Sequence, residues 1–246
     1  MIFNRLLTRD IFKKACLGIV LAFASISSVK AERVQITSFG HSSLLIKGGG
    51  HSVLLNPFKA VGCAEGLSEP KNVSADVVLA SSELADEGNR NVRGLFLSEP
   101  GSYRIRDLAL EGFTAPHDRF GGRRYGLATA WQWVQGGVNF VHLGGSVSPI
   151  RFQEKLLVGR PDVLVIAVGG GAKVYNAREA AAVVKYLNPK IVIPVQYVRG
   201  TNPSSCDQTG IEPFLEAMEG IQVRDVGKTF NVRGKISDEL VIKLMP

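Results

Sequence analysis

The hydrophobic pattern of the sequence changes near its middle, and this change constrains the fold more than any other feature. Short alternating or apolar runs separated by glycine turns fill the first half, and they predict strands joined as hairpins. These runs cover residues 34–39, 43–47, 52–56, 77–80, 103–106, 108–114, 128–134 and 138–143. The second half predicts helices over 149–158, 177–187 and 212–218, with strands over 162–168 and 191–195. Hairpins first and β-α-β units later predict two sheets with helices outside them.

The first 31 residues have the three parts of a secretory signal peptide. A basic segment precedes an apolar run from Ala15 to Val29, and Val29-Lys30-Ala31 has the pattern of a cleavage site. We expect export to a periplasmic, lumenal or secreted location, with a mature chain that starts at Glu32. An uncleaved anchor is the alternative, but the apolar run is shorter than the ~20 residues that a membrane span needs. We therefore expect no membrane span after cleavage.

The remaining chain, residues 32–246, has no internal repeat or linker and is predicted to be a single domain. Its charge is nearly balanced. The whole sequence has 29 Lys and Arg against 22 Asp and Glu, a net charge of +7. Residues 1–31 hold five of these basic residues and one acid, which leaves 24 against 21, or +3. Because no long basic run remains, we do not expect nucleic acid as a partner.

Two cysteines, Cys63 and Cys206, remain after the signal peptide is removed, since Cys16 lies within it. In an oxidising compartment two thiols can form one disulfide, while two free buried thiols are the alternative. A zinc site is not indicated, because neither a CxxC nor an HxxxH pattern accompanies them.

Two groups of motifs carry a resemblance to a known family. The first group is Thr37-Ser38-Phe39-Gly40-His41-Ser42-Ser43 followed by Leu54-Leu55-Asn56-Pro57, and the second is the β-α-β pattern from Asp162 to Pro194. Their order resembles the metallo-β-lactamase fold superfamily, in its branch of small lactone and ester hydrolases. The resemblance runs from about Val34 to Tyr197 and implies an α/β fold, the four-layer αββα sandwich. It also implies that the loops with Cys63 and Cys206 meet on the active-site face, so we expect them to form a disulfide.

The metal-binding motif of that family is changed in this chain. Where the family carries T-H-x-H-x-D-H after a buried strand, the chain reads SSELADE over residues 81–87. The resemblance places Ser82, Leu84 and Glu87 at the three histidine positions. Asp86 stands at the position of the family's aspartate. Leucine cannot bind a metal ion, and a serine hydroxyl is a weak ligand.

The family's remaining ligand positions fall on three further residues. The resemblance matches His117 to the next histidine, Gly145 to the bridging aspartate and Gln196 to the last histidine. Zinc needs about three strong protein ligands, and a two-metal site needs a group that bridges ions ~3.5–4 Å apart. We therefore expect no cofactor. The alternative is one divalent metal ion, Mn, Mg or Zn, on Asp86, Glu87 and His117, an oxygen-rich set that favours Mn or Mg.

Basic residues near His117 indicate a different kind of ligand. Arg119, Arg123 and Arg124 follow this histidine through a Gly-Gly turn. Arginines on a loop can hold a carboxylate or a phosphate, although a solvated basic loop is the alternative. Without a metal, a buried Asp86 or Glu87 would need another counter-charge or hydrogen-bond donors, and we expect one of these arginines to supply the charge.

Four candidate residues also have structural interpretations. Asp86 is expected to cap a helix after its loop, and His41 to hold the turn that follows Gly40. His142 is expected to be structural, and His51, beside a glycine turn, to be solvated. A Ser-His-Asp hydrolase is not expected, because the G-x-S-x-G motif is absent from the sequence.

These observations favour an exported protein whose former active-site cleft binds a small anionic molecule or a protein partner. Asp86 and His117 are expected to lie at the centre of this cleft, with ligand-binding residues Arg119, Arg123, Arg124, His41 and Gln196 around them. The alternative is a hydrolase of a lactone or ester that uses one residual metal ion. Whether the protein is an enzyme depends on the site, because a fold alone does not supply a function.

Overall fold

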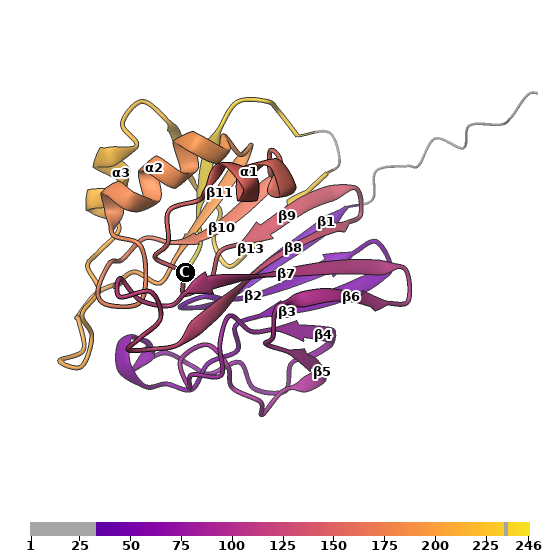
Figure 1. Ribbon diagram of the computed structural model, residues 1–246, viewed down its shortest axis with the longest axis horizontal. Coiled ribbons are helices and arrows are strands. Elements are labelled where there is room, and N and C mark those ends of the chain that lie inside the picture. The colour runs from indigo at the N-terminus through magenta and orange to yellow at the C-terminus, as the bar shows by residue number, and fades with distance from the viewer. Residues whose placement is uncertain (1–32, 234–235) are drawn as a thin grey trace, which may run out of the picture. The chain divides into compact units, whose positions relative to one another are not determined.

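Two β-sheets lie face to face in the part of the chain that the structure describes, residues 33–233 and 236–246 (Figure 1). The structure is a computed structural model. The expected signal peptide and the mature start at Glu32 lie outside the described residues. Among the helices of the described residues, none is long and apolar enough to cross a membrane.

The first sheet has six strands in the order β13-β1-β2-β3-β4-β5. Its strands are β1 (Val34–Gly40), β2 (Ser43–Gly48), β3 (His51–Leu55), β4 (Ser74–Leu79), β5 (Arg93–Leu97) and β13 (Thr229–Val232). The strands β1, β2 and β3 pair antiparallel through tight turns, and β4 and β5 continue the sheet in parallel. The predicted strands of this region are confirmed within a few residues, whereas β5 and β13 were not predicted.

The second sheet has eight strands in the order β12-β14-β11-β10-β9-β8-β7-β6. Its strands are β6 (Gly101–Ile105), β7 (Leu108–Pro116), β8 (Leu127–Gln135), β9 (Val138–His142), β10 (Val163–Ala167), β11 (Ile191–Val195), β12 (Gln222–Asp225) and β14 (Val241–Leu244). Antiparallel hairpins join β6 to β9, and β9, β10, β11, β14 and β12 run parallel. The predicted change from hairpins to β-α-β units is therefore confirmed.

Three α-helices of the described residues cover the outer face of the second sheet (Figure 1). They are α1 (Phe152–Val158), α2 (Ala177–Leu187) and α3 (Glu212–Ala217). The helix α2 begins at a capping box, because the side chains of Asn176 and Glu179 bond each other's backbone N–H groups. Its apolar face packs on Leu164, Ile166 and Val192 of the sheet beneath.

The main core lies between the two sheets. Buried side chains of the first sheet, including Ile36, Val77 and Leu79, pack against Trp131 and Phe140 of the second. The outer face of the first sheet has a smaller apolar cluster, which includes the loop residues Val73 and Val92. A short 3-10 helix, η1 (Gly62–Ala64), lies in the loop after β3. The α/β class and the two-sheet sandwich are thus as predicted.

One end of the sandwich is closed by a side chain that joins the two sheets. The Nε2 atom of Gln135, at the end of β8, lies 3.3, 3.0 and 3.0 Å from the carbonyl oxygens of Ile46, Gly48 and His51. His51 was expected to be solvated, and this is wrong. Its side chain is 5% exposed, and Nε2 lies 2.7 Å from the carboxylate of Asp107. The candidate site lies at the opposite end.

Candidate functional site

The candidate site forms where strands of both sheets end at the same edge. His41 follows β1, Ser82 follows β4 and His117 follows β7. Gly145 and Gln196 come shortly after β9 and β11. Because neighbouring strands that run the same way end together, residues far apart in sequence meet here.

A buried carboxylate–imidazole pair lies at the centre of the site. The Oε1 atom of Glu87 is 3.0 Å from Nε2 of His117, and both side chains are fully buried. Ser82 donates its hydroxyl hydrogen to the same carboxylate oxygen at 2.6 Å. The amide of Gln196 donates to Oε2 at 3.4 Å. On its other side, His117 Nδ1 bonds the carbonyl oxygen of Gly145.

The two members of this pair shift each other's pKa. Burial alone would raise the pKa of Glu87, but its contact with His117 and the Ser82 hydroxyl outweigh burial and lower it to about 2. Burial alone would lower the pKa of His117, but the Glu87 carboxylate and the Gly145 carbonyl raise it. Each group therefore favours the charged form of the other, as opposite charges in a poorly solvated site do.

A second ion pair lies beside the first. The ammonium group of Lys173, in the loop between β10 and α2, bonds the carboxylate of Asp86. The side chains of Asp86 and Lys173 are 13% and 21% exposed. The positive charge of Lys173 also lowers the pKa of Glu87 and opposes the rise at His117.

Two expectations about Asp86 are therefore wrong. Residues 83–87 form bends and a turn, in which the backbone N–H groups of Glu87 and Gly88 both donate to the carbonyl of Leu84. No helix follows this turn, so Asp86 caps no helix. Its counter-charge comes from Lys173 and not from an arginine. Sequence reasoning missed this lysine. Its position just after β10 and the Gly-Gly-Gly turn could have placed it near the site, but it did not identify Asp86 as its partner.

The three arginines near His117 have other contacts. Arg119 forms an ion pair with Glu179 at 2.7 Å. Arg123 donates to the carbonyl of Phe120 at 3.0 Å, and the guanidinium of Arg124 lies 5.0 Å from the ring centre of Tyr125. Within residues 33–233 and 236–246, no acidic side chain lies within ion-pair distance of Arg123 or Arg124, so no protein carboxylate neutralises them.

The loop that carries these arginines is held by one carboxylate. Backbone N–H groups of Phe120, Gly122, Arg124 and Tyr125 all donate to Asp118. Burial opposes ionisation of Asp118, but these donors lower its pKa to about 2. Four bonds to one carboxylate give the loop a defined shape.

His41 and Gln196 lie side by side at the edge of the pair. The backbone N–H of Gln196 donates to the carbonyl of His41 at 3.0 Å, and their side-chain nitrogens are 3.5 Å apart. Both residues have a left-handed backbone, with φ of 52° and 50°. Burial lowers the pKa of His41, although the charges of Asp86 and Glu87 oppose this. The side chain of His41 thus contacts Gln196 and the ring of Phe58 and lies close enough to the carboxylates of Asp86 and Glu87 for their charges to act on it.

His142 lies behind the site and has a structural environment. Its ring is fully buried, with Nε2 3.3 Å from the hydroxyl of Ser81. Burial lowers its pKa to about 4, so the ring is neutral near pH 7. This is consistent with the structural role expected from the sequence.

The backbone at Gly145 leaves no room for a side chain. A Cβ atom there would lie 2.0 Å from Cε1 of His117 and 2.9 Å from Oε1 of Glu87. The imidazole and the carboxylate thus fill the space that a residue such as aspartate would need. Across residues 33–233 and 236–246, no group of three or more His, Cys, Asp or Glu side chains is placed to hold a metal ion.

Two further features border the site. Cys63 and Cys206 form a disulfide, which links the loop after β3 to the loop after β11, and their pairing agrees with the sequence prediction. A hollow of about 370 Å³ opens beside Ser82, and its lining includes the hydroxyl groups of Ser98, Thr114 and Tyr125. The buried pair therefore has a polar hollow beside it, which meets it at Ser82.

Comparisons with known proteins agree with this architecture. Residues 35–196 match the family model described as the beta-lactamase superfamily domain. The UPF0173 proteins PF0020 of Pyrococcus furiosus and PYRAB01190 of Pyrococcus abyssi are each 24% identical over 191 residues, which cover 67% of this chain and 83% of theirs.

Solved structures give the same result for the fold. A hydrolase of the metallo-beta-lactamase superfamily from Thermotoga maritima, described as zinc-dependent, has a TM-score of 0.68 and 23% identity, and the match covers 87% of this chain and 100% of that one. The metallo hydrolase Igni18 from Ignicoccus hospitalis has a TM-score of 0.58 and 18% identity, with 83% and 100% covered. At these identities the likeness establishes the fold alone.

Proposed function

We propose, from the premise that the chain belongs to the beta-lactamase superfamily, that it is an exported protein without the metal centre of its relatives. In this proposal its former metal cleft binds a small anionic molecule, and a protein partner with an acidic group is the alternative occupant. The fold is that of the metallo-hydrolases, so the difference must come from the residues at the site.

The pair of Glu87 and His117 is the observation that carries this proposal. Both carboxylate oxygens of Glu87 accept hydrogen bonds, and Nδ1 of His117 bonds the Gly145 carbonyl. Nε2 of His117 has no hydrogen bond within the described residues, but the Glu87 carboxylate lies 3.0 Å from it and occupies the position where a metal ion would sit. Gly145 leaves no space for a bridging carboxylate. A divalent ion needs several free donors in one shell, and the Lys173 ammonium beside Glu87 would repel a second cation. The residues present therefore do not fit a metal ion.

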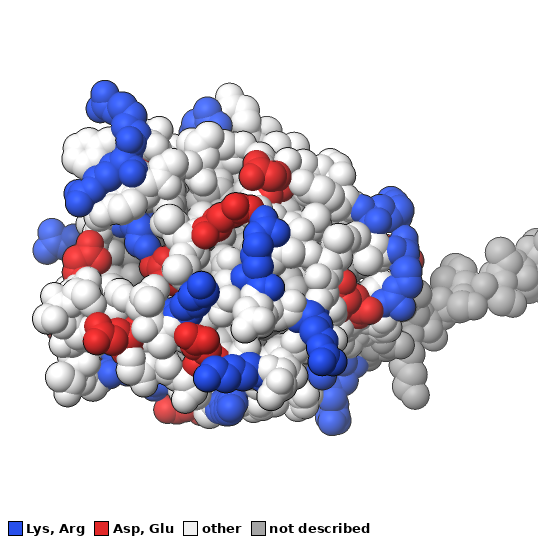
Figure 2. Space-filling view, turned by 90° about the horizontal axis from the view of Figure 1, so that it is seen from below, with Lys and Arg blue, Asp and Glu red and all other residues white. Residues whose placement is uncertain are grey.

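Positive charge on the loop after β7 supports an anionic ligand. Arg123 and Arg124 have no acidic partner within residues 33–233 and 236–246, and their loop is held in place by Asp118. A guanidinium group binds a carboxylate or a phosphate through two parallel hydrogen bonds. Figure 2 shows a face on which Lys and Arg alternate with Asp and Glu, unlike the continuous basic groove of a nucleic-acid site.

Two features support export. The first 31 residues have the signal-peptide pattern. The disulfide between Cys63 and Cys206 is a bond that persists in oxidising compartments and is rare in the cytosol of most organisms.

Calorimetry on the purified protein tests the proposal. Zinc should bind no more tightly than micromolar, and inorganic phosphate or acetate should bind with an affinity that Arg123→Ala and Arg124→Ala weaken. Arg104→Ala, an exposed arginine on β6 outside the site, is the control and should change nothing. Nanomolar zinc binding, with an esterase or lactonase activity that His117→Ala abolishes, would instead establish the residual metal hydrolase.

A further inference from the structure

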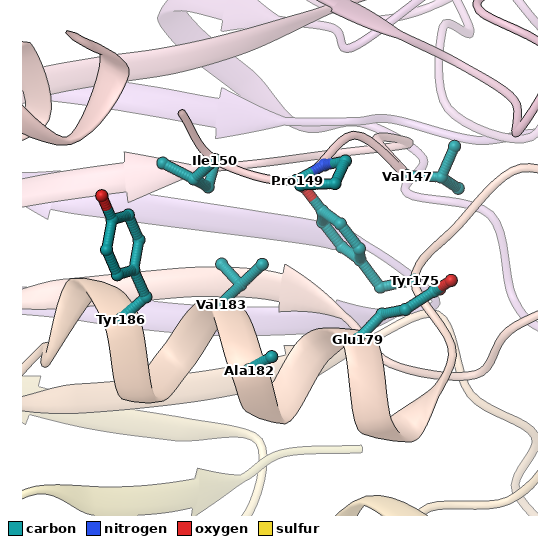
Figure 3. A pocket seen from close by; sticks show the side chains of 8 residues that line it. All are labelled: Val147, Pro149, Ile150, Tyr175, Glu179, Ala182, Val183 and Tyr186. Atoms are coloured by element: carbon teal, nitrogen blue, oxygen red, sulfur yellow. The ribbon is translucent and has the colours of Figure 1, made fainter. Parts of the chain in front are cut away.

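An apolar hollow lies between α2 and the segment after β9, and neither Glu87 nor His117 lines it. It has a volume of about 270 Å³. One wall comes from Val147, Pro149 and Ile150 in the segment after β9, and the other from Ala182, Val183 and Tyr186 on α2. Figure 3 shows these side chains along α2, from Glu179 and Val147 at one end to Ile150 and Tyr186 at the other.

The apolar surface continues beyond Tyr186 onto α1. Phe152, Leu156 and Leu157 are 63%, 67% and 65% exposed, although α1 has only seven residues. A second hollow of about 510 Å³ is lined by Phe152, Leu156, Tyr186 and the basic residues Lys155 and Arg160. We call the two hollows together the α1–α2 groove. Several large apolar side chains exposed together mark a binding surface on a soluble protein.

The charges along the α1–α2 groove differ between its ends. At the inner end, Glu179 is neutralised by Arg119 at 2.7 Å and also accepts a hydrogen bond from the backbone of Asn176. At the outer end, the ammonium of Lys155 lies 4.0 Å from the ring centre of Tyr186. No acidic side chain of residues 33–233 and 236–246 lies within ion-pair distance of Lys155. Arg160 at this end is already paired with Asp238 at 3.2 Å, so Lys155 is the unneutralised cation of the outer end. The groove thus has apolar walls, an internally neutralised ion pair at the inner end and one positive charge at the outer end.

We propose that the α1–α2 groove binds a single-chain anionic amphiphile, such as a medium-chain fatty acid. Its acyl chain lies between Val147 and Val183, where contact with apolar walls removes it from water. Its carboxylate meets Lys155 at the outer end. A concave groove with one cationic end fits one such molecule better than the flat surface of a bilayer. This inference is independent of the anion site proposed above.

Calorimetry with decanoate, below the concentration at which it forms micelles, tests this inference. Decanoate should bind with a 1:1 ratio, at least tenfold more tightly than decyltrimethylammonium, which has the same chain length and the opposite charge. Lys155→Glu should weaken decanoate binding at least tenfold. Lys185→Glu, an exposed lysine on α2 outside the groove lining, is the matched control and should leave the affinity unchanged.

A second variant tests the apolar part of the groove. Ala182 is exposed on α2, so Ala182→Trp can fill the hollow without entering the core, and it should abolish decanoate binding while the melting temperature stays the same. Equal affinity for the two amphiphiles, or unchanged binding in both variants, would overturn the inference. So would binding to phosphatidylglycerol vesicles without binding of free decanoate, or a dimer that Leu156→Glu separates.

Discussion

Each end of the sandwich holds a histidine–carboxylate pair, and the two pairs have opposite surroundings. At the cleft end, Glu87 and His117 lie 3.0 Å apart and both are fully buried. At the closed end, His51 and Asp107 lie 2.7 Å apart, but the Asp107 side chain is 86% exposed. Glu87 and His117 are therefore stabilised mainly by each other and by protein hydrogen bonds, whereas water also solvates the carboxylate of Asp107.

This difference determines what each pair does for the protein. Water screens the charge of Asp107, so the pair at the closed end adds little to stability. Glu87 has no water to replace a lost partner, and Ser82 and Gln196 complete its hydrogen bonds. A buried pair is a weak source of stability while intact, but it is costly to break.

The largest expected effect comes from breaking the buried pair. Glu87→Gln keeps the shape of the side chain and removes its charge, so His117 must either stay charged in a buried site without a counter-charge or release its proton. We expect the free energy of unfolding to fall by about 3–5 kcal/mol, measured by urea denaturation. Asp107→Asn makes the equivalent change at the exposed pair and should leave the unfolding midpoint unchanged. Equal losses in the two variants would show that burial does not distinguish the pairs.

The disulfide is a second feature of the cleft end. Cys63 and Cys206 are 143 residues apart, so the bond restricts the unfolded chain strongly. Reduction should lower the free energy of unfolding by about 2–4 kcal/mol, measured by denaturation with and without reductant. A Cys63→Ser, Cys206→Ser double variant should match the reduced protein and should not respond to reductant. If reductant also destabilised the double variant, its effect on the wild type would not come from this disulfide.

Close packing around the buried pair predicts a smaller effect at Gly145. Gly145→Ala places a methyl group against His117 and Glu87, and it should cost about 1–3 kcal/mol through overpacking. The control is Gly50→Asn at the closed end, where φ is 74° and no atom lies within 4 Å of the added Cβ. Asparagine tolerates this backbone, so the control should melt almost as the wild type does. A Gly145→Ala protein of unchanged stability would mean that the pair can move apart.

The pH dependence of stability should also differ between the two pairs. Glu87 has a pKa lowered from 4.5 to about 2, so its contribution is present above pH 4.5 and is lost as the pH falls toward 2. His117 has a pKa raised from 6.5, so its contribution is complete below 6.5 and is lost as the pH rises through the raised value. His142, with a pKa lowered to about 4, adds a loss as the pH falls below 6.5.

Unfolding measured from acid to mildly alkaline pH checks these signs. Compared with wild type, Glu87→Gln should lose less unfolding free energy as the pH falls below 4.5, because it lacks the carboxylate that titrates there. It should also lose less as the pH rises above 6.5, because the variant lacks the carboxylate that raises the pKa of His117. Asp107→Asn should change the profile much less. If the unfolding free energy of Glu87→Gln and of wild type fell equally below pH 4.5, Glu87 would not be the group that causes this loss.

Much of the fold could be predicted from local patterns. Alternating runs and glycine turns gave most strands of the two sheets, and Asn176 marked the start of α2. The strands β5, β12, β13 and β14 were not predicted. Exposed residues such as Arg93 and Gly94 in β5, and the wholly exposed Gln222–Asp225 of β12, carry no alternating apolar signal, so only pairing with a neighbouring strand defines them.

The site was harder to predict than the fold. The loop with Ser82 and Glu87, and the positions of His117 and Gln196, were found through the resemblance to a family. The partner of Asp86 was not, because Lys173 lies 87 residues away and nothing local connects the two. Glu87, which was treated only as a possible ligand, is the group that His117 and Gln196 both contact. Long-range charge pairing depends on how the loops fold together, which local sequence does not report.

The Gln135 side chain at the closed end has a consequence for how the molecule moves. Its amide contacts three carbonyl groups of the hairpin formed by β2 and β3, and these contacts connect the two sheets at one edge. Small opening motions then separate the sheets at the far edge first, where loops replace paired strands. Amide hydrogens beside Gln135 should exchange with solvent only when the whole domain unfolds, while those around Gly144 and Gly145 should exchange through local opening.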